Sequence, residues 1–63
     1  MKYQVGDLIK YYDEIMLITK IEINSSYGFV STDYIMFNLT SKNPIKYHEY
    51  ATSHIDHFAS KLE

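Results

Sequence analysis

The feature that most constrains this chain is its short length combined with a lack of cysteine, because it must fold around a small core without covalent support. The 63 residues contain no cysteine, so neither a disulfide nor a thiolate zinc site can form. A chain of this size buries only about 60% of the surface that it exposes when unfolded. Hydrophobic residues make up 46% of the chain and charged residues 22%, which is typical of a folded domain. We therefore expect residues 1–63 to form a single domain of limited stability.

The composition also bears on compartment and source. The longest apolar run, Ile15 to Ile18, has four residues, which is too few to span a membrane. The first residues carry no apolar stretch of the kind that secretory signals contain. All six basic residues are lysine, and residues with AT-rich codons are abundant, which favours an AT-rich genome such as those of many bacteriophages and some bacteria. We expect a soluble, cytoplasmic protein.

Hydrophobic periodicity predicts several short β-strands. Residues 34–40 alternate cleanly, with Ile35, Phe37 and Leu39 on one side of the strand. Residues 15–23 end in a second alternation that is rich in β-branched side chains. Further strands are expected at residues 8–12, 29–30 and 45–50, with turns or loops at 13–14, 24–28, 31–33 and 41–44.

The C-terminal residues change to a helical period. Apolar side chains recur there at spacings of three and four, which predicts a short helix near residues 54–61 or a single 3₁₀ turn. Ser53 followed by Asp56 fits a capping box with Asp in place of Glu. The residues of the predicted apolar helix face are Ile55, Phe58, Ala59 and Leu62.

Four or five short strands and a small helix favour a closed sheet, because a flat sheet would leave one face uncovered. The fold is therefore expected to be mainly β, with four or five antiparallel strands curled into a small barrel and a short C-terminal helix or 3₁₀ turn. The predicted core consists of Val5, Leu8, Leu17, Ile21, Ile35, Phe37, Leu39, Ile55 and Phe58.

Several short segments resemble a known family. Residues 5–11 (VGDLIKY) and 17–21 (LITKI) resemble the first two strands of small SH3-like barrel proteins. Residues 27–29 (YGF), 37–40 (FNLT) and 53–55 (SHI) resemble the later strands and the 3₁₀ turn of small, mostly uncharacterised SH3-like proteins from tailed bacteriophages. The resemblance spans most of the chain. It implies an SH3-like barrel encoded by a phage and acting in the host cytoplasm, and it implies no defined chemistry.

The sequence offers little for catalysis or for a metal. No serine lies in a Gly-x-Ser-x-Gly motif, and the two glycines are isolated, so a nucleophile elbow and a phosphate-binding loop are both missing. A chain this short also has little room for a substrate pocket. His48, His54 and His57 match no helical zinc motif, and we expect His54 and His57 to be solvated at the start of the helix. The sequence thus favours a non-enzymatic protein without a metal or cofactor.

Two kinds of binding remain as hypotheses. Seven tyrosines and three methionines favour a protein partner, either a host factor or a phage protein, because both residue types are enriched in interfaces. Nucleic acid is the alternative, since some small barrels bind it. However, the six lysines form no basic run against eight acidic residues, and arginine is absent. Unpaired edge strands would also favour a homodimer, and both a monomer and a dimer stay open.

The resemblance also implies a place for the binding site, between the loop after the first strand and the loop that joins the middle strands. In this chain those are residues 11–14 and 24–27. The stretch 11–13 (YYD) resembles the aromatic and acidic residues with which SH3 domains hold proline-rich peptides, although the chain lacks the Trp of that groove. The residues expected to bind the partner, including outward ones opposite the predicted core, are Tyr11, Tyr12, Asp13, Tyr34, Met36 and Tyr50.

Overall fold

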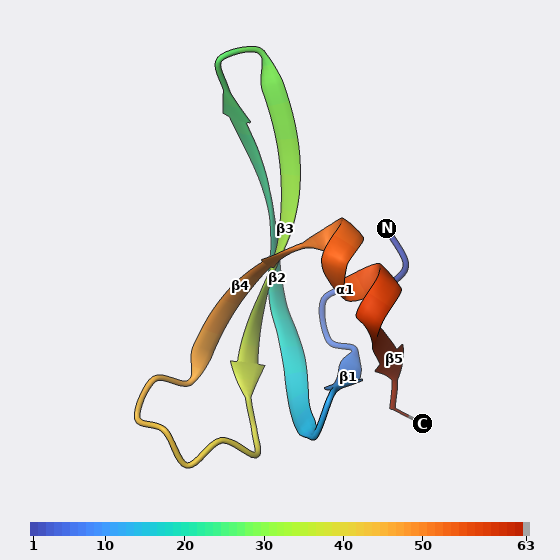
Figure 1. Ribbon diagram of the computed structural model, residues 1–63, viewed down its shortest axis with the longest axis vertical. Helices are drawn as coiled ribbons and strands as arrows, with labels where there is room; N and C mark the ends of the chain where they lie inside the picture. The colour runs from blue at the N-terminus through green and yellow to red at the C-terminus, as the bar shows by residue number, and fades with distance from the viewer. Residues whose placement is uncertain (63) are drawn as a thin grey trace.

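The chain folds into one antiparallel sheet and one short helix, seen in a computed structural model that describes residues 1–62. The strand order is β4-β3-β2-β1-β5, and α1 lies against the inner face of the sheet (Figure 1). The described residues are thus mainly β, as predicted, but the sheet is open, so the closed barrel is not confirmed. The elements in chain order are β1 (Leu8–Tyr11), β2 (Glu14–Ser26), β3 (Phe29–Asn38), β4 (Tyr47–Ala51), α1 (Thr52–Phe58) and β5 (Ala59–Lys61).

The hairpin of β2 and β3 is much longer than the sequence indicates. The predicted loop at 24–28 reduces to a two-residue turn, Tyr27-Gly28, and the predicted break at 31–33 is wrong. Both turn residues have positive φ, 49° and 80°, as a type I′ hairpin turn requires. Cross-strand hydrogen bonding therefore holds polar residues of low strand propensity in extended form. Residues 23–32, which we call the arm, project beyond the other strands (Figure 1).

The C-terminal segment differs from prediction at both ends. The helix is an α-helix that starts at Thr52 and ends at Phe58. Residues 59–61 form β5 instead of a last helical turn, because they pair with β1 in the register Tyr11↔Ala59. No helix within residues 1–62 is long and apolar enough to cross a membrane.

The predicted capping box is also wrong. No side chain caps the start of α1, where Ala51 is the N-cap residue. The Asp56 carboxylate instead accepts a hydrogen bond from the backbone N–H of Lys2, at 3.2 Å, and one from the Tyr34 hydroxyl, at 2.7 Å. Through these two hydrogen bonds Asp56 connects the helix to β3 and to the N-terminal segment.

The core lies between the inner face of the sheet and α1, and in β3 it uses the alternation opposite to the predicted one. Of the predicted core residues only Ile55 is buried, while Ile21 packs partly buried against the core. Leu17, Ile35 and Phe37 are partly exposed. The other predicted core residues are exposed: Val5, Leu8, Leu39 and Phe58. The buried apolar side chains are Tyr3, Ile9, Met16, Ile18, Tyr34, Met36, Ile55 and Ala59.

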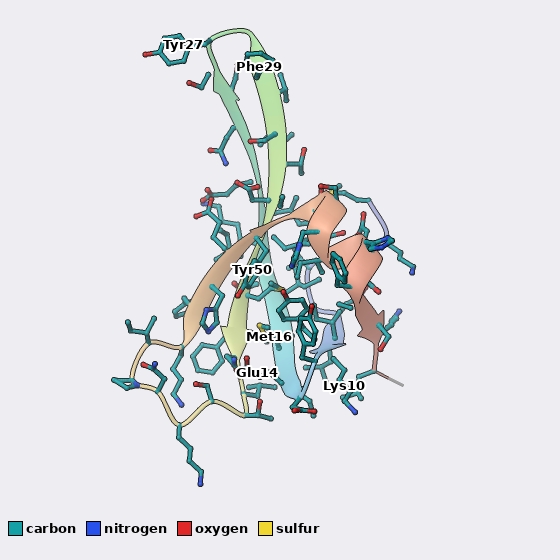
Figure 2. All side chains as sticks on the ribbon, in the orientation of Figure 1. Lys10, Glu14, Met16, Tyr27, Phe29 and Tyr50 are labelled. Carbon is teal, nitrogen blue, oxygen red and sulfur yellow. The ribbon has the colours of Figure 1, made fainter. Side chains whose placement is uncertain are left out.

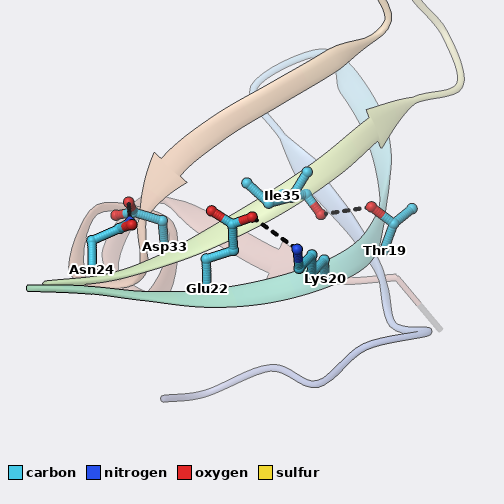
Figure 3. A network of polar contacts seen from close by, with 6 residues as sticks. All are labelled: Thr19, Lys20, Glu22, Asn24, Asp33 and Ile35. Atoms are coloured by element: carbon cyan, nitrogen blue, oxygen red, sulfur yellow. Dashed lines mark hydrogen bonds and ion pairs between the residues drawn. The ribbon is translucent and has the colours of Figure 1, made fainter.

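A β-bulge in β2 helps to set this arrangement. The pairing of β2 with β3 shifts between Ile18↔Met36 and Lys20↔Ile35, which leaves Thr19 as the extra residue. The Thr19 hydroxyl donates a hydrogen bond of 3.1 Å to the Ile35 carbonyl oxygen (Figure 3). The bulge therefore shifts the alternation of β2 by one residue at its middle.

The shift keeps both halves of β2 apolar on the inside. Ile18 before the bulge pairs with Met36, and Ile21 after it pairs with Tyr34. Residues directly opposite each other in an antiparallel pair share a face. Tyr34 and Met36 are both 0% exposed, so the prediction that their side chains point outward is wrong.

Hydrogen bonds between buried polar atoms connect the two ends of the chain to this core. The Tyr34 hydroxyl accepts a hydrogen bond of 3.1 Å from the Tyr3 N–H, and the Tyr3 hydroxyl donates one of 2.8 Å to the Ala59 carbonyl oxygen. Burial, followed by the bond to Asp56, raises the pKa of Tyr34. At the end of β3 the Asn38 side-chain oxygen accepts backbone N–H groups from the residues that follow it, which closes the strand.

Candidate binding surface

Three of the predicted binding residues meet at one end of the inner face. Tyr11 ends β1, Tyr12 lies in the β1–β2 turn, and Tyr50 lies on β4. The ring centroids are 4.6 Å apart for Tyr11 and Tyr12 and 5.4 Å apart for Tyr11 and Tyr50. Asp13 is exposed in the same turn. The fold thus brings together three residues that the sequence assigned to one site, although they come from distant parts of the chain. The predicted outward position of Tyr50 is wrong, because Tyr50 pairs with Tyr34 on the inner face and packs partly buried against the core.

Three further rings join them, and these were not among the predicted site residues. His54, on α1, brings its Nε2 atom to 2.6 Å from the Tyr11 hydroxyl and stacks on Tyr50 with 20° between the ring planes. His48 stacks on Tyr50 at 22°, and Phe58 lies 4.8 Å from His54 between ring centroids. The aromatic cluster, as we name it, consists of Tyr11, Tyr12, His48, Tyr50, His54 and Phe58.

Spacing in the sequence could have indicated two of these additions. His48 and Tyr50 are two residues apart, so they share one face of a strand. His54 and Phe58 are four apart, so they are neighbours on a helix. What the sequence did not show is that α1 follows β4 directly and folds back against it, which stacks His54 on Tyr50.

Two predicted binding residues and one predicted binding loop lie away from the aromatic cluster. Tyr34 and Met36 belong to the interior and present no surface to a partner. The β2–β3 turn at Tyr27 is at the tip of the arm, far from Tyr50 and from the β1–β2 turn (Figures 1 and 2). The two loops that the resemblance placed beside one site therefore lie at opposite ends of the molecule, because the β2–β3 hairpin is so long.

The Tyr11 hydroxyl of the aromatic cluster keeps its proton near neutral pH. Burial raises the pKa of the Tyr11 hydroxyl, and the neighbouring Tyr12, Tyr50 and Glu14 raise it further. The hydroxyl is therefore protonated and can share a hydrogen with His54 Nε2, in a direction set by the tautomer of the imidazole. The Nε2 atom of His48 is buried and has no hydrogen-bond partner within residues 1–62.

Tyr12 sits in a strained backbone conformation at the edge of the aromatic cluster. Its φ of 52° lies in the left-handed region, which bulky residues rarely adopt. Such a conformation costs about 1–3 kcal/mol and is concentrated at functional sites. The Tyr12 side chain is 66% exposed and Phe58 is 52% exposed, so the cluster presents both to solvent.

The charged groups beside the aromatic cluster are acidic. Asp13 follows Tyr12 in the turn, and Glu14 pairs with Tyr11 across β1 and β2. Lys10, although adjacent in sequence, pairs with Ile15 and so faces the outer side of the sheet. The described residues form no enclosed pocket, and among them no group of three or more potential ligands is placed to hold a metal ion. The surface is thus open, aromatic and without positive charge from Lys10.

Comparison with known proteins identified no relative of this chain, since no family model, no curated protein and no solved structure matches it significantly. The resemblance to SH3-like phage proteins therefore stays a prediction.

Proposed function

We propose that this chain is a small binding module that contacts a protein partner through the aromatic cluster. The observation that carries the proposal is the packing of six rings from β1, the β1–β2 turn, β4 and α1 on one side of the molecule, with Tyr12 and Phe58 exposed. Aromatic side chains are enriched at the centres of protein interfaces. Because these rings already pack on one another, binding would immobilise few rotatable side chains.

A protein partner suits the charges of the surface better than a nucleic acid does. Nucleic-acid binding gains most of its affinity from lysine and arginine at the phosphates. The cluster is instead flanked by Asp13 and Glu14, and Lys10 faces away. An extended peptide or a protein surface with apolar side chains matches an open aromatic surface that is flanked by these two carboxylates.

The SH3-like fold and a phage origin also remain part of the proposal. The resemblance implies a meander of strands with a helical turn near the C-terminus. The observed order, with α1 between β4 and the last strand β5, supports that topology. The resemblance to SH3-like proteins also favours action on a host or phage protein in the cytoplasm.

Peptide selection with matched tyrosine variants tests the proposal. Peptides are selected from a random displayed library on the wild-type protein, and their affinities are then measured for Tyr12→Ala and Tyr27→Ala. The two tyrosines are closely matched, because each is exposed in a two-residue hairpin turn with positive φ. They differ in location, since only Tyr12 belongs to the aromatic cluster.

We expect Tyr12→Ala to weaken the selected peptides by about tenfold or more, as the loss of an interface anchor does. Tyr27→Ala should bind them like the wild type. Equal binding to Tyr12→Ala and wild type would contradict the proposal, as would equal losses in both variants. Salt-dependent binding of an oligonucleotide, without any selected peptide, would replace it with the nucleic-acid alternative.

A further inference from the structure

The strand β4 forms one edge of the sheet, and its outward backbone groups have no partner strand. In an antiparallel ladder, hydrogen-bonded pairs alternate with pairs whose backbone groups point away from each other. The Asn38 N–H donates to the Lys46 carbonyl oxygen at 2.7 Å, which fixes this alternation along β4. The N–H and C=O groups of Tyr47 and Glu49 therefore point away from β3. No backbone group within residues 1–62 bonds to them.

This edge is exposed and regular. Tyr47, Glu49 and Ala51 are exposed, and no other element lies along the outer side of β4 (Figure 1). Natural edge strands are usually short, bulged, or blocked by proline or lysine. The five residues of β4 pair with β3 without a register shift and include neither residue type, whereas β5, at the opposite edge, has three residues and ends in Lys61. The free edge of β4 can therefore accept a further strand.

An added strand would meet different surroundings on the two faces of the sheet, because side chains alternate along β4. His48 and Tyr50 lie on the inner face, where their rings stack in the aromatic cluster. Glu49 lies between them in sequence and faces the outer side. Side chains of an added strand on the inner face would thus lie beside aromatic rings, and those on the outer face would lie beside a carboxylate.

The outer side of this edge is acidic. Glu49 lies diagonally across from Asp33 on β3, and Asp33 pairs with Glu22 on β2. Lys20 forms an ion pair with Glu22 at 3.0 Å (Figure 3), but no basic residue within 1–62 forms one with Asp33 or Glu49. The bond to Asp33, then burial and the nearby carboxylates, raise the pKa of Glu49. A cation beside Glu49 would offset this repulsion.

A second copy of β4 does not supply that cation. When two β4 strands pair antiparallel through their free backbone groups, every register that bonds Glu49 to the other β4 brings the two Glu49 side chains together. They lie either directly opposite or diagonally adjacent on the same face. Like charges at such positions destabilise a sheet. The charge of the edge therefore favours a segment of another protein that carries a basic residue.

We propose that the partner binds as an extended strand along the free edge of β4, with a lysine or arginine over Glu49 and an apolar residue on each side of it. The two apolar side chains then lie on the inner face, beside His48 and Tyr50. In strand addition the main-chain bonds supply affinity and the alternating side chains supply specificity. This inference rests on the proposed function, because the partner is the segment that contacts the aromatic cluster, and it adds the conformation and sequence pattern of that segment.

Backbone methylation of a selected peptide tests the added strand. Peptides selected on the wild-type protein should share an apolar-basic-apolar triplet. One version is N-methylated at the basic residue and another at the next residue. Neighbouring N–H groups of a strand point to opposite sides, so only one of the two bonds to β4, and strand direction decides which. We expect one version to bind about tenfold more weakly and the other to match the unmodified peptide. Equal effects, or selected peptides without a basic residue, would overturn the proposal.

Charge exchange tests the position of the basic residue. The selected peptide and a version with glutamate in place of its basic residue are titrated into wild type, Glu49→Lys and Asp13→Lys. Asp13→Lys is the control, because it makes the same charge change at an exposed carboxylate in the β1–β2 turn. Glu49→Lys should weaken the selected peptide about tenfold and restore binding of the glutamate version. Restored binding on Asp13→Lys instead, or on neither variant, would overturn the proposal.

The strand and the aromatic cluster can fail separately. Peptides that bind Tyr12→Ala weakly but show neither the methylation pattern nor charge exchange contact the cluster without adding a strand, which overturns this inference alone. Peptides that show both effects and bind Tyr12→Ala like the wild type support the strand and contradict the role of Tyr12 in the proposed function. A dimer in sedimentation that excludes these peptides would assign the edge to a second copy and overturn the inference.

Discussion

Replacing Met36 and, separately, Phe37 by alanine tests which face of β3 forms the core, because neighbours on a strand face opposite sides of the sheet. Met36 is 0% exposed, so truncation leaves a cavity and should cost about 2–5 kcal/mol of unfolding free energy. Phe37 is partly exposed, with its ring centroid 5.2 Å from that of Tyr47 on the open outer face. Truncation there leaves no enclosed cavity, and we expect a loss of about 1 kcal/mol.

The difference is large relative to the stability of the whole domain. A chain of 63 residues is stabilised by about 3–9 kcal/mol in total, so Met36→Ala removes a large part of it. The assay is urea unfolding followed by circular dichroism, at a concentration low enough to keep the protein monomeric. A greater loss for Phe37→Ala than for Met36→Ala would refute the inner-face core and support the alternation predicted from the sequence.

Two further predictions concern hydrogen bonds and titration. Tyr34→Phe removes the hydroxyl that joins the Tyr3 N–H to the Asp56 carboxylate, and should cost about 1–3 kcal/mol, seen as a lower melting temperature; an unchanged melt would contradict the role of this hydroxyl. The raised pKa of Glu49 means that the folded state binds its proton more tightly, so wild-type stability falls as pH rises through that pKa. Glu49→Gln lacks this loss, so the variant should be more stable than the wild type at neutral pH and about as stable as the wild type below the ordinary pKa of 4.5. A stability difference between the two proteins that does not change with pH would argue against the carboxylate interaction with Asp33.

Local patterns predicted the class of the fold, but not which face of the sheet is buried. Residues 34–40 carry apolar side chains on both sides of the strand, since Tyr34 and Met36 alternate with Ile35 and Phe37. Periodicity alone then gives a strand without giving its orientation. Tyr34 and Met36 are buried because of their partners in β2, whose alternation is shifted by the bulge at Thr19. These partners are distant in sequence, so no local pattern around residues 34–40 indicates the pairing.

The sequence predicted the residues of the candidate site that local patterns indicate, and it missed those that only tertiary packing brings to the site. Tyr11 and Tyr12 lie at a turn that the sequence indicates, and Tyr50 was assigned to the same surface. His54 was expected to be solvated, because a lone histidine near a helix start shows nothing of its neighbours. Its contact with Tyr11 depends on α1 folding back after β4, which is a tertiary property.

The most direct test of the central claim is a nuclear magnetic resonance titration of the isotope-labelled protein with the tightest selected peptide. If the aromatic cluster binds the partner, the signals of Tyr12, Tyr50 and His54 should shift progressively with peptide. The signals of the arm, and those of Leu17 and Phe37 on the outer face of the sheet, should remain in place. Shifts confined to the arm, or to Leu17 and Phe37 on the outer face, would contradict the account.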